Sequence, residues 1–385
     1  MVSVKYTGAF RDYSGYGEAN RQFINALHSA GVNTQAELVK YCPDKGLDFG
    51  PILSVCEQCG QNQIGGYKVK VLHITPDQLT HYVENGKYNI SHLFWETDLL
   101  PTRFVDGLRY ANEVWTGSQA NADAIRNSTG INNIFIFPQP YSYIEPNMQS
   151  LEFKDALVKD KINYVFYSIF EWSDRKNPVG LIISFLKEFD GVSDVELVLK
   201  TYKTDYSLDF IFFAQNVVNQ LIVNNNISNA PLISFIFELV DKSNIIGLHL
   251  YGDCYVSPHH GEGWGIPTVE AMSYGNPVIT TGYGGIGEYL TNDIHGIVLD
   301  YEMDNIEGMV GAEHYYERGQ KWAVVSEDDI RGSMKKMYLN KEKTVQMGAE
   351  AKKFVETFLS PVRIGNLMKE RIIEIEGSVG ENSLY

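Results

Sequence analysis

Short apolar runs typical of β-strands alternate with helical patterns along almost the whole chain, and this alternation constrains the fold more than any other feature. After a first strand at residues 2–6, apolar residues recur at three- and four-residue steps from Ala19 to Ala30, which predicts one buried helical face that ends at Gly31. Further strands are expected at residues 68–74, 90–95, 113–116, 133–137, 164–169, 195–200, 232–237, 254–257, 277–281 and 296–299. Strands that alternate with helices predict an α/β fold with parallel sheets covered by helices.

The alternation lapses at residues 141–161 and then restarts, which divides the chain into two similar parts. A chain of 385 residues is also too long for one ordinary core. We therefore predict two doubly wound domains, at residues 1–145 and 160–358. The second contains a well-marked helix with Asn177 as its N-cap and Pro178 at its first position.

Charge and hydropathy exclude several classes of protein. Lys and Arg number 32 against 48 Asp and Glu, which gives a net charge of −16 and argues against broad electrostatic binding of nucleic acid. The N-terminus has no signal-peptide pattern, and the most apolar run, residues 208–223, is interrupted by Asp209 and several amides, so no transmembrane segment is expected.

The four cysteines do not form a recognisable framework. Cys56 and Cys59 make one CxxC pair with Cys42 upstream, but a structural zinc site needs four ligands and the chain offers no second pair. Plain thiols are the favoured interpretation over a zinc site, and a reducing, cytoplasmic location follows.

The strongest candidate site is the segment 257–272, SPHHGEGWGIPTVEAM. A strand ends in a glycine-rich turn, and Pro267 opens a helix, so backbone N–H groups and the helix dipole favour an anion beyond the sheet. Glu262 in the turn and Glu270 in the first helical turn would repel phosphate, and they suit the hydroxyls of a sugar or ribose. The alternative is a tight structural turn in which Glu270 merely favours the helix N-terminus.

A second candidate is the run Arg175-Lys176 immediately before the helix that Asn177 caps. Two cations and a helix dipole can converge there on one diphosphate and stabilise the charge that develops on a leaving group. The alternative is a pair of solvated charges ahead of a helix.

Two weaker features follow strands. Gly15, Tyr16 and Gly17 follow the first strand, where a glycine pair permits close approach of the backbone to a ligand, although a plain strand–helix turn is the favoured interpretation of this pattern alone. Lys200 ends its expected strand and is placed near the site by position alone.

The pattern HGEGWG-P-xx-EAM-xxGNPVI, with seven residues between Glu262 and Glu270, resembles the E-x7-E motif of retaining GT-B glycosyltransferases of the family 4 type. The resemblance extends over nearly the whole chain and implies two Rossmann-like domains facing each other across a cleft. A last helix, residues 359–385, would cross back to the N-terminal domain.

The same resemblance implies roles for individual residues. Glu270 would bind the ribose hydroxyls of a nucleotide-sugar and Glu262 the transferred sugar. Lys176 and Arg175 would bind the diphosphate, although family members place the Lys several residues after the Arg, where this chain has the two adjacent. The remaining donor contacts would come from residues 15–17, His259, Gly263, Trp264 and Gly265, and Lys200 is added to them by its position alone.

Glu96 departs from the family pattern. Many members carry a His near this point beside the reacting sugar, whereas this chain has Phe94-Trp95-Glu96, with His92 slightly upstream. Glu96 is therefore a candidate for contact with the acceptor or sugar, and an ordinary salt bridge at a strand end is the alternative.

The expected function is that of a cytoplasmic, retaining glycosyltransferase that uses a nucleotide-sugar as substrate and no cofactor. No DxD motif occurs in the setting of a diphosphate site, so no metal is expected. The acceptor would be a glycan, a lipid or a small molecule. Three alternatives remain: a sugar-nucleotide epimerase, a non-catalytic sugar-nucleotide-binding protein and a viral-type DNA-base glycosyltransferase. A phosphorylase would need a pyridoxal-phosphate lysine motif, which the sequence does not show.

Overall fold

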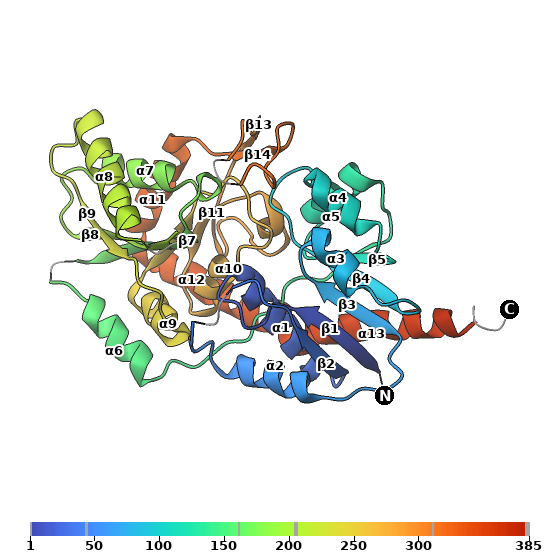
Figure 1. The fold of residues 1–385 in the computed structure, drawn as a ribbon. Coiled ribbons are helices and arrows are strands. Elements are labelled where there is room, and N and C mark those ends of the chain that lie inside the picture. Colours follow the sequence, from blue (N-terminus) through green and yellow to red (C-terminus); the bar gives the residue numbers. More distant parts are fainter. Residues whose placement is uncertain (1, 43–44, 161, 204–206, 310–311, 382–385) are drawn as a thin grey trace. The chain divides into compact units, whose positions relative to one another are not determined.

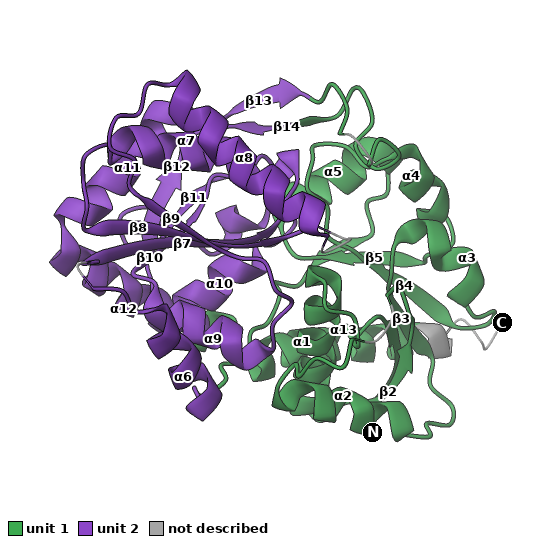
Figure 2. Ribbon diagram, turned by 60° about the vertical axis from the view of Figure 1, so that its left-hand side comes forward, with its two compact units in different colours: residues 1–144, 306–321, 356–385 green, residues 145–305, 322–355 purple. Residues whose placement is uncertain are grey.

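The computed structural model describes residues 2–42, 45–160, 162–203, 207–309 and 312–381. The chain forms two compact units, each built on its own sheet (Figures 1 and 2). Unit 1 comprises residues 1–144, 306–321 and 356–385, and unit 2 comprises residues 145–305 and 322–355. The segment 306–321 therefore belongs to unit 1 although unit 2 residues flank it, an arrangement that the sequence pattern did not indicate.

The sheet of unit 1 has six parallel strands in the order β2-β1-β3-β4-β5-β6. The strands are β1 (Ser3–Gly8), β2 (Asn33–Leu38), β3 (Val69–His73), β4 (Tyr88–His92), β5 (Glu113–Thr116) and β6 (Ile134–Ile136). The order reverses between β1 and β3. In open α/β sheets such a reversal marks where ligands bind, beyond the carboxyl ends of the strands.

The helices of unit 1 are α1 (Gly15–Ser29), α2 (Pro51–Gln61), η1 (Pro76–Gln78), α3 (Leu79–Tyr82), α4 (Thr102–Leu108), α5 (Gln119–Thr129) and α13 (Pro361–Glu381). The predicted apolar stripe of α1 is buried. The last helix, α13, packs against α1, and Ile364, Met368 and Ile372 are fully buried in the core of this unit.

The sheet of unit 2 has six parallel strands in the order β12-β11-β10-β7-β8-β9. The strands are β7 (Tyr164–Glu171), β8 (Val195–Tyr202), β9 (Leu232–Ile236), β10 (Cys254–Ser257), β11 (Val278–Thr281) and β12 (Gly296–Leu299). Counted from β7, this is the doubly wound order of dinucleotide-binding folds, and it reverses between β7 and β10. The loops that follow these two strands are the ones that carry Arg175, Lys176 and Glu262.

The helices of unit 2 are α6 (Met148–Leu157), η2 (Asp174–Lys176), α7 (Pro178–Glu188), α8 (Leu208–Asn224), α9 (Lys242–Tyr251), α10 (Ile266–Ser273), η3 (Gly284–Glu288), α11 (Glu327–Leu339) and α12 (Lys341–Phe358). The strands β13 (Glu302–Asn305) and β14 (Lys321–Val324) pair in a separate two-stranded sheet. The predicted cap of α7 is confirmed, since Asn177 Oδ1 accepts the N–H of Gly180 at 3.1 Å. Among the helices described, none is both long and apolar enough to cross a bilayer.

The structure confirms the α/β prediction, and it adds elements that the sequence analysis did not foresee. The strand β2 and the helix α2 lie between residues 33 and 61, where no strand or helix was predicted. The CxxC pair lies on α2, and both thiols are fully buried in the apolar core of unit 1. All four cysteines are free thiols. In the ranges that the structure describes, no three His, Cys, Asp or Glu side chains form a group that could hold a metal ion.

Candidate active site

Hydrogen bonds join the loops after β7 and β10 at the point where the strand order of unit 2 reverses. The guanidinium of Arg175 donates from Nη1 to the carbonyl of Gly261 at 2.7 Å, and the N–H of His260 donates to the carbonyl of Arg175 at 2.7 Å. Asn177, which caps α7, also donates from Nδ2 to the carbonyl of Pro258 at 3.0 Å. The two candidate segments of the sequence thus form one local structure.

The charges of these loops are paired. Lys176 Nζ donates to Glu262 Oε1, and Arg175 Nη1 lies 3.8 Å from Glu262 Oε2. Only 14% of the Lys176 side chain and 15% of the Arg175 side chain are exposed, so the alternative of two solvated charges is wrong. Burial by itself would raise the pKa of Glu262, but the charges of Lys176 and Arg175 outweigh burial and lower that pKa to about 2. Glu262 is therefore held as a carboxylate.

The ring of His259 lies in the same loop and is fully buried. Its two ring nitrogens have no hydrogen-bond partner among the described residues, and burial lowers the pKa of His259 to about 3. Its carbonyl accepts the hydroxyl of Thr281 at 2.7 Å, which ties the loop to the end of β11. A neutral, buried imidazole without partners is a polar group that a ligand can still satisfy.

The glycine-rich turn leads into α10 through Gly265, whose φ of +84° is the left-handed conformation that glycine adopts without strain. Trp264 is buried, and its ring lies 4.9 Å from that of Tyr289. The hydroxyl of Tyr289 donates to the carbonyl of Trp264 at 3.0 Å. The ring contact and the hydrogen bond together hold Trp264 against Tyr289 and so anchor the turn.

The segment η3 lies against this turn and was not selected from the sequence. A Cβ on Gly284 would lie 2.0 Å from the carbonyl oxygen of Glu262, and one on Gly285 would lie 2.6 Å from the carbonyl oxygen of Gly263. The signal was available in the sequence as the run Gly284-Gly285 just after β11. Close backbone packing of η3 therefore fixes the position of the Glu262 loop.

Glu270 is the fifth residue of α10, so its placement in the first helical turn was wrong. Its side chain is buried, and Oε1 accepts from Lys242 Nζ at the start of α9. Oε2 lies 3.7 Å from Nε2 of His249, and burial lowers the pKa of this histidine. A simple helix-terminus role does not explain this ion pair. Lys242 was missed because a lone lysine at a helix start carries no recognisable pattern.

Lys200 lies two residues before the end of β8, because the strand continues to Tyr202. Its side chain is buried, and Nζ lies 5.1 Å from the ring centroid of Tyr202. Burial lowers the pKa of Lys200 to about 8, against a smaller opposing effect of Glu238 after β9. A buried cation of this kind is suited to an anionic ligand.

The other four predicted residues belong to unit 1. Gly15, Tyr16 and Gly17 form the first turn of α1, where the N–H of Gly17 donates to Ser14 Oγ at 3.3 Å. Glu96 is half-buried in the loop after β4. The structure thus divides the predicted site between its two units, with the charged residues 175, 176, 262 and 270 all in unit 2.

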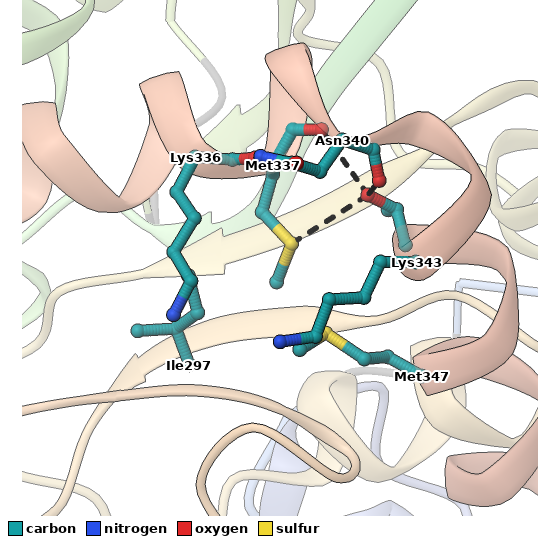
Figure 3. Close-up of a pocket in the computed structure, with 7 residues that line it drawn as sticks. Ile297, Lys336, Met337, Asn340, Lys343 and Met347 are labelled. Atoms are coloured by element: carbon teal, nitrogen blue, oxygen red, sulfur yellow. Dashed lines mark hydrogen bonds between the residues drawn. The ribbon is translucent and has the colours of Figure 1, made fainter.

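A small pocket of unit 2 involves none of these residues (Figure 3). It is lined by Ile297, Lys336, Met337, Asn340, Lys343, Thr344 and Met347. Its volume of about 10 Å³ accommodates one water molecule at most, whereas small-molecule sites usually occupy several hundred Å³. This pocket is therefore not a donor site.

A comparison with models of known protein families matches the segment that contains the Glu262 loop and α10. Residues 225–312, which include the glycine-rich turn and both glutamates, match the family model of glycosyl transferases group 1. Curated protein sequences give no match.

Solved structures are similar over nearly the full length. HepE from Anabaena with UDP and glucose shares 14% identity at a TM-score of 0.68, with 97% of this chain and 100% of that chain covered. Sucrose-phosphate synthase from Thermosynechococcus elongatus shares 12% identity at a TM-score of 0.68, with 98% of this chain and 100% of that chain covered. A glycosyltransferase from Rickettsia africae shares 12% identity at a TM-score of 0.64, with 99% of each chain covered. The chain therefore has the GT-B fold, and residues 225–312 match a segment of the glycosyl transferases group 1 family.

Proposed function

We propose that this protein is a retaining, metal-independent glycosyltransferase of the family 4 type that works in the cytoplasm. It would move a sugar from a nucleotide-sugar to an acceptor hydroxyl. One observation carries the proposal: Lys176, Arg175 and Glu262 converge at the strand-order reversal of unit 2. Glu262 also lies in residues 225–312, the segment that matches the family model of glycosyl transferases group 1.

The donor diphosphate would bind between the first turns of α7 and α10. Helix N-termini carry partial positive charge and favour anions, and Lys176 and Arg175 add two full charges. A diphosphate gains negative charge as the glycosidic bond breaks, so charge that is already in place lowers the barrier. These groups supply the role that a divalent ion has in other transferases, and activity is therefore expected without added metal.

The glutamates would bind the neutral parts of the donor. A carboxylate accepts hydrogen bonds from two hydroxyls at once, which suits Glu270 for the ribose and Glu262 for the transferred sugar. Lys242 would hold the Glu270 carboxylate in place, since it already engages Oε1. Glu262 is ionised near neutral pH because its pKa is about 2, so it accepts hydrogen bonds and stabilises positive charge on the sugar but does not donate a proton.

Transfer would proceed on one face of the sugar. The bond between the anomeric carbon and the diphosphate oxygen breaks while the acceptor oxygen bonds to that carbon from the same side. The acceptor proton passes to the departing phosphate oxygen. No protein nucleophile is needed, and the anomeric configuration is kept.

UDP-glucose is the first donor to test, because HepE has been crystallised with UDP-glucose on the same fold. We would screen UDP-, GDP- and ADP-sugars by thermal shift, where a ligand at 100 times its Kd adds about 2.7 kcal/mol of stability. Donors that bind would be incubated with acceptors in the presence of EDTA, and the anomeric configuration of the product read by proton NMR. An inverted product refutes the retaining mechanism, and loss of activity in EDTA refutes metal independence.

The same screen separates the alternatives. Binding of nucleotide without consumption of any donor would indicate a non-catalytic binding protein. Transfer to DNA that carries modified bases would indicate a DNA-base glycosyltransferase.

A further inference from the structure

Tyrosine and carboxylate side chains gather at the carboxyl edge of the unit 1 sheet, beside the strand-order reversal between β1 and β3. Tyr16 lies in the first turn of α1, Tyr41 follows β2, Asp77 follows β3 and Glu96 follows β4. The rings of Tyr16 and Tyr41 lie 6.4 Å apart in an edge-to-face arrangement. Reversals of this kind are where open α/β sheets bind ligands.

The edge also receives a segment from a distant part of the sequence, residues 312–321, which we call the docked segment. The ring of Tyr316 stacks on that of Trp95 at 5.6 Å and 19°. Glu317 accepts from both the N–H and the hydroxyl of Thr102, at 3.1 Å and 2.9 Å. The N–H of Asp98 donates to the carbonyl of Lys321 at 3.1 Å. These contacts hold the docked segment against Trp95, which precedes Glu96, and against residues 98–102, which follow it.

Tyr315 of the docked segment joins the cluster directly. Its ring lies 5.6 Å from that of Phe104, and the guanidinium of Arg103 lies 5.1 Å above it. Arg103 in turn is ion-paired with Oδ2 of Asp77. Burial, followed by the charges of Tyr41, Glu96, Asp77 and Tyr315, raises the pKa of Tyr16 well above its usual value, in keeping with their gathering at one place.

The cluster contains polar atoms that still lack partners. Oδ1 of Asp77 is buried and accepts no hydrogen bond from the described residues. The ring of His73, fully buried at the end of β3 and 5.1 Å from Tyr16, pairs its Nδ1 with the Tyr6 hydroxyl at 2.7 Å, but its Nε2 has no partner there. Buried polar atoms without partners are destabilising unless a ligand or water satisfies them.

We propose that the docked segment is an acceptor-recognition element and that the acceptor is a saccharide. This inference rests on the proposed function and adds the class of acceptor to it. A sugar has hydroxyls, which donate to carboxylates, and C–H faces, which pack on aromatic rings. Tyr16, Tyr41 and Tyr315 together with Asp77 and Glu96 present both kinds of group, whereas an acyl chain would need a groove lined by aliphatic side chains.

The test compares transfer of sugar with hydrolysis of the donor in one variant. The acceptors are p-nitrophenyl glycosides of glucose, galactose, mannose and N-acetylglucosamine, immobilised glycans on an array, and diacylglycerol in vesicles as the lipid arm. Tyr315→Ala should lower the ratio of transfer to hydrolysis about tenfold, mainly through a higher acceptor KM. Tyr110→Ala, which removes an exposed tyrosine of unit 1 outside the cluster, is the matched control and should leave the ratio unchanged.

Two further variants guard against misfolding. Tyr315→Phe keeps the ring contacts and should reduce the ratio less than Tyr315→Ala, and Asp77→Asn should raise the acceptor KM with a near-native melting temperature. Transfer only to diacylglycerol, no binding of any glycan in the presence of UDP, or an unchanged ratio in Tyr315→Ala would overturn the inference. Hydrolysis of the donor reports on the proposed function separately, so the two can fail independently.

Discussion

Replacing Lys176 by Met tests the ion pair on which the candidate site depends. The pKa of Glu262 falls from the ordinary 4.5 to about 2, which corresponds to about 3 kcal/mol in favour of its charged form in the folded protein. With Lys176 removed, the nearest cation is Arg175 at 3.8 Å, and burial raises the pKa of Glu262 again. We therefore expect Lys176→Met to lower the free energy of unfolding of unit 2 by about 2–3 kcal/mol at pH 7.

The pH dependence has a definite sign. Because the folded-state pKa of Glu262 is lowered, its stabilising contribution is complete above about pH 5 and is lost as the pH falls towards 2. The wild type should thus lose stability more steeply on acidification than Lys176→Met. Urea unfolding followed by tryptophan fluorescence at pH 7 and pH 4, with Trp172, Trp264 and Trp322 as the tryptophans of unit 2, measures the difference.

A double-mutant cycle with Glu262→Gln isolates the pair. The coupling energy should be about 2 kcal/mol or more, and Lys176→Arg should keep most of it because the charge remains. A coupling below about 0.5 kcal/mol is typical of an exposed pair and would refute the reasoning. Parallel acid profiles for wild type and Lys176→Met would refute it as well.

Three further changes have definite expected outcomes. Glu270→Gln should weaken donor binding by about 1.5–3 kcal/mol in isothermal titration calorimetry, the range for a hydrogen bond to a charged group, and unchanged affinity would rule out a ribose contact. Lys200→Met should raise the free energy of unfolding by about 3 kcal/mol at pH 7, because a pKa lowered from 10.5 to about 8 destabilises the fold below pH 8 and the penalty disappears by pH 10.5; a loss of stability in urea unfolding would contradict this. Gly284→Ala should destabilise unit 2 by about 1–3 kcal/mol and reduce donor affinity, since its Cβ would lie 2.0 Å from the Glu262 carbonyl at a φ of +85°; calorimetry that shows neither effect would contradict it.

Most of the sheet framework could be predicted because its strands are buried on both faces and stand out as apolar runs. The strand β2 was missed because its sequence, NTQAEL, is largely polar and lies at the edge of the sheet. The docked segment could not be assigned to unit 1 because long-range packing, such as that of Tyr316 on Trp95, leaves no local pattern.

The candidate site was predictable where glycine spacing and adjacent charges mark a loop, as at Glu262 and Lys176. It was not predictable where a single residue acts through the fold. Lys242 reaches Glu270 because α9 and α10 both adjoin β10 in the chain, and nothing in the sequence around Lys242 indicates this pairing.

Release of nucleoside diphosphate from a panel of nucleotide-sugars, with wild type and Glu262→Gln side by side, tests the central claim most directly. We predict release from at least one donor, and a fall of about 10²–10³ in kcat for the variant, the range for loss of one preorganised charged group. No release from any donor by the wild type, or equal kcat values for the two proteins, would contradict the assignment of this site to glycosyl transfer.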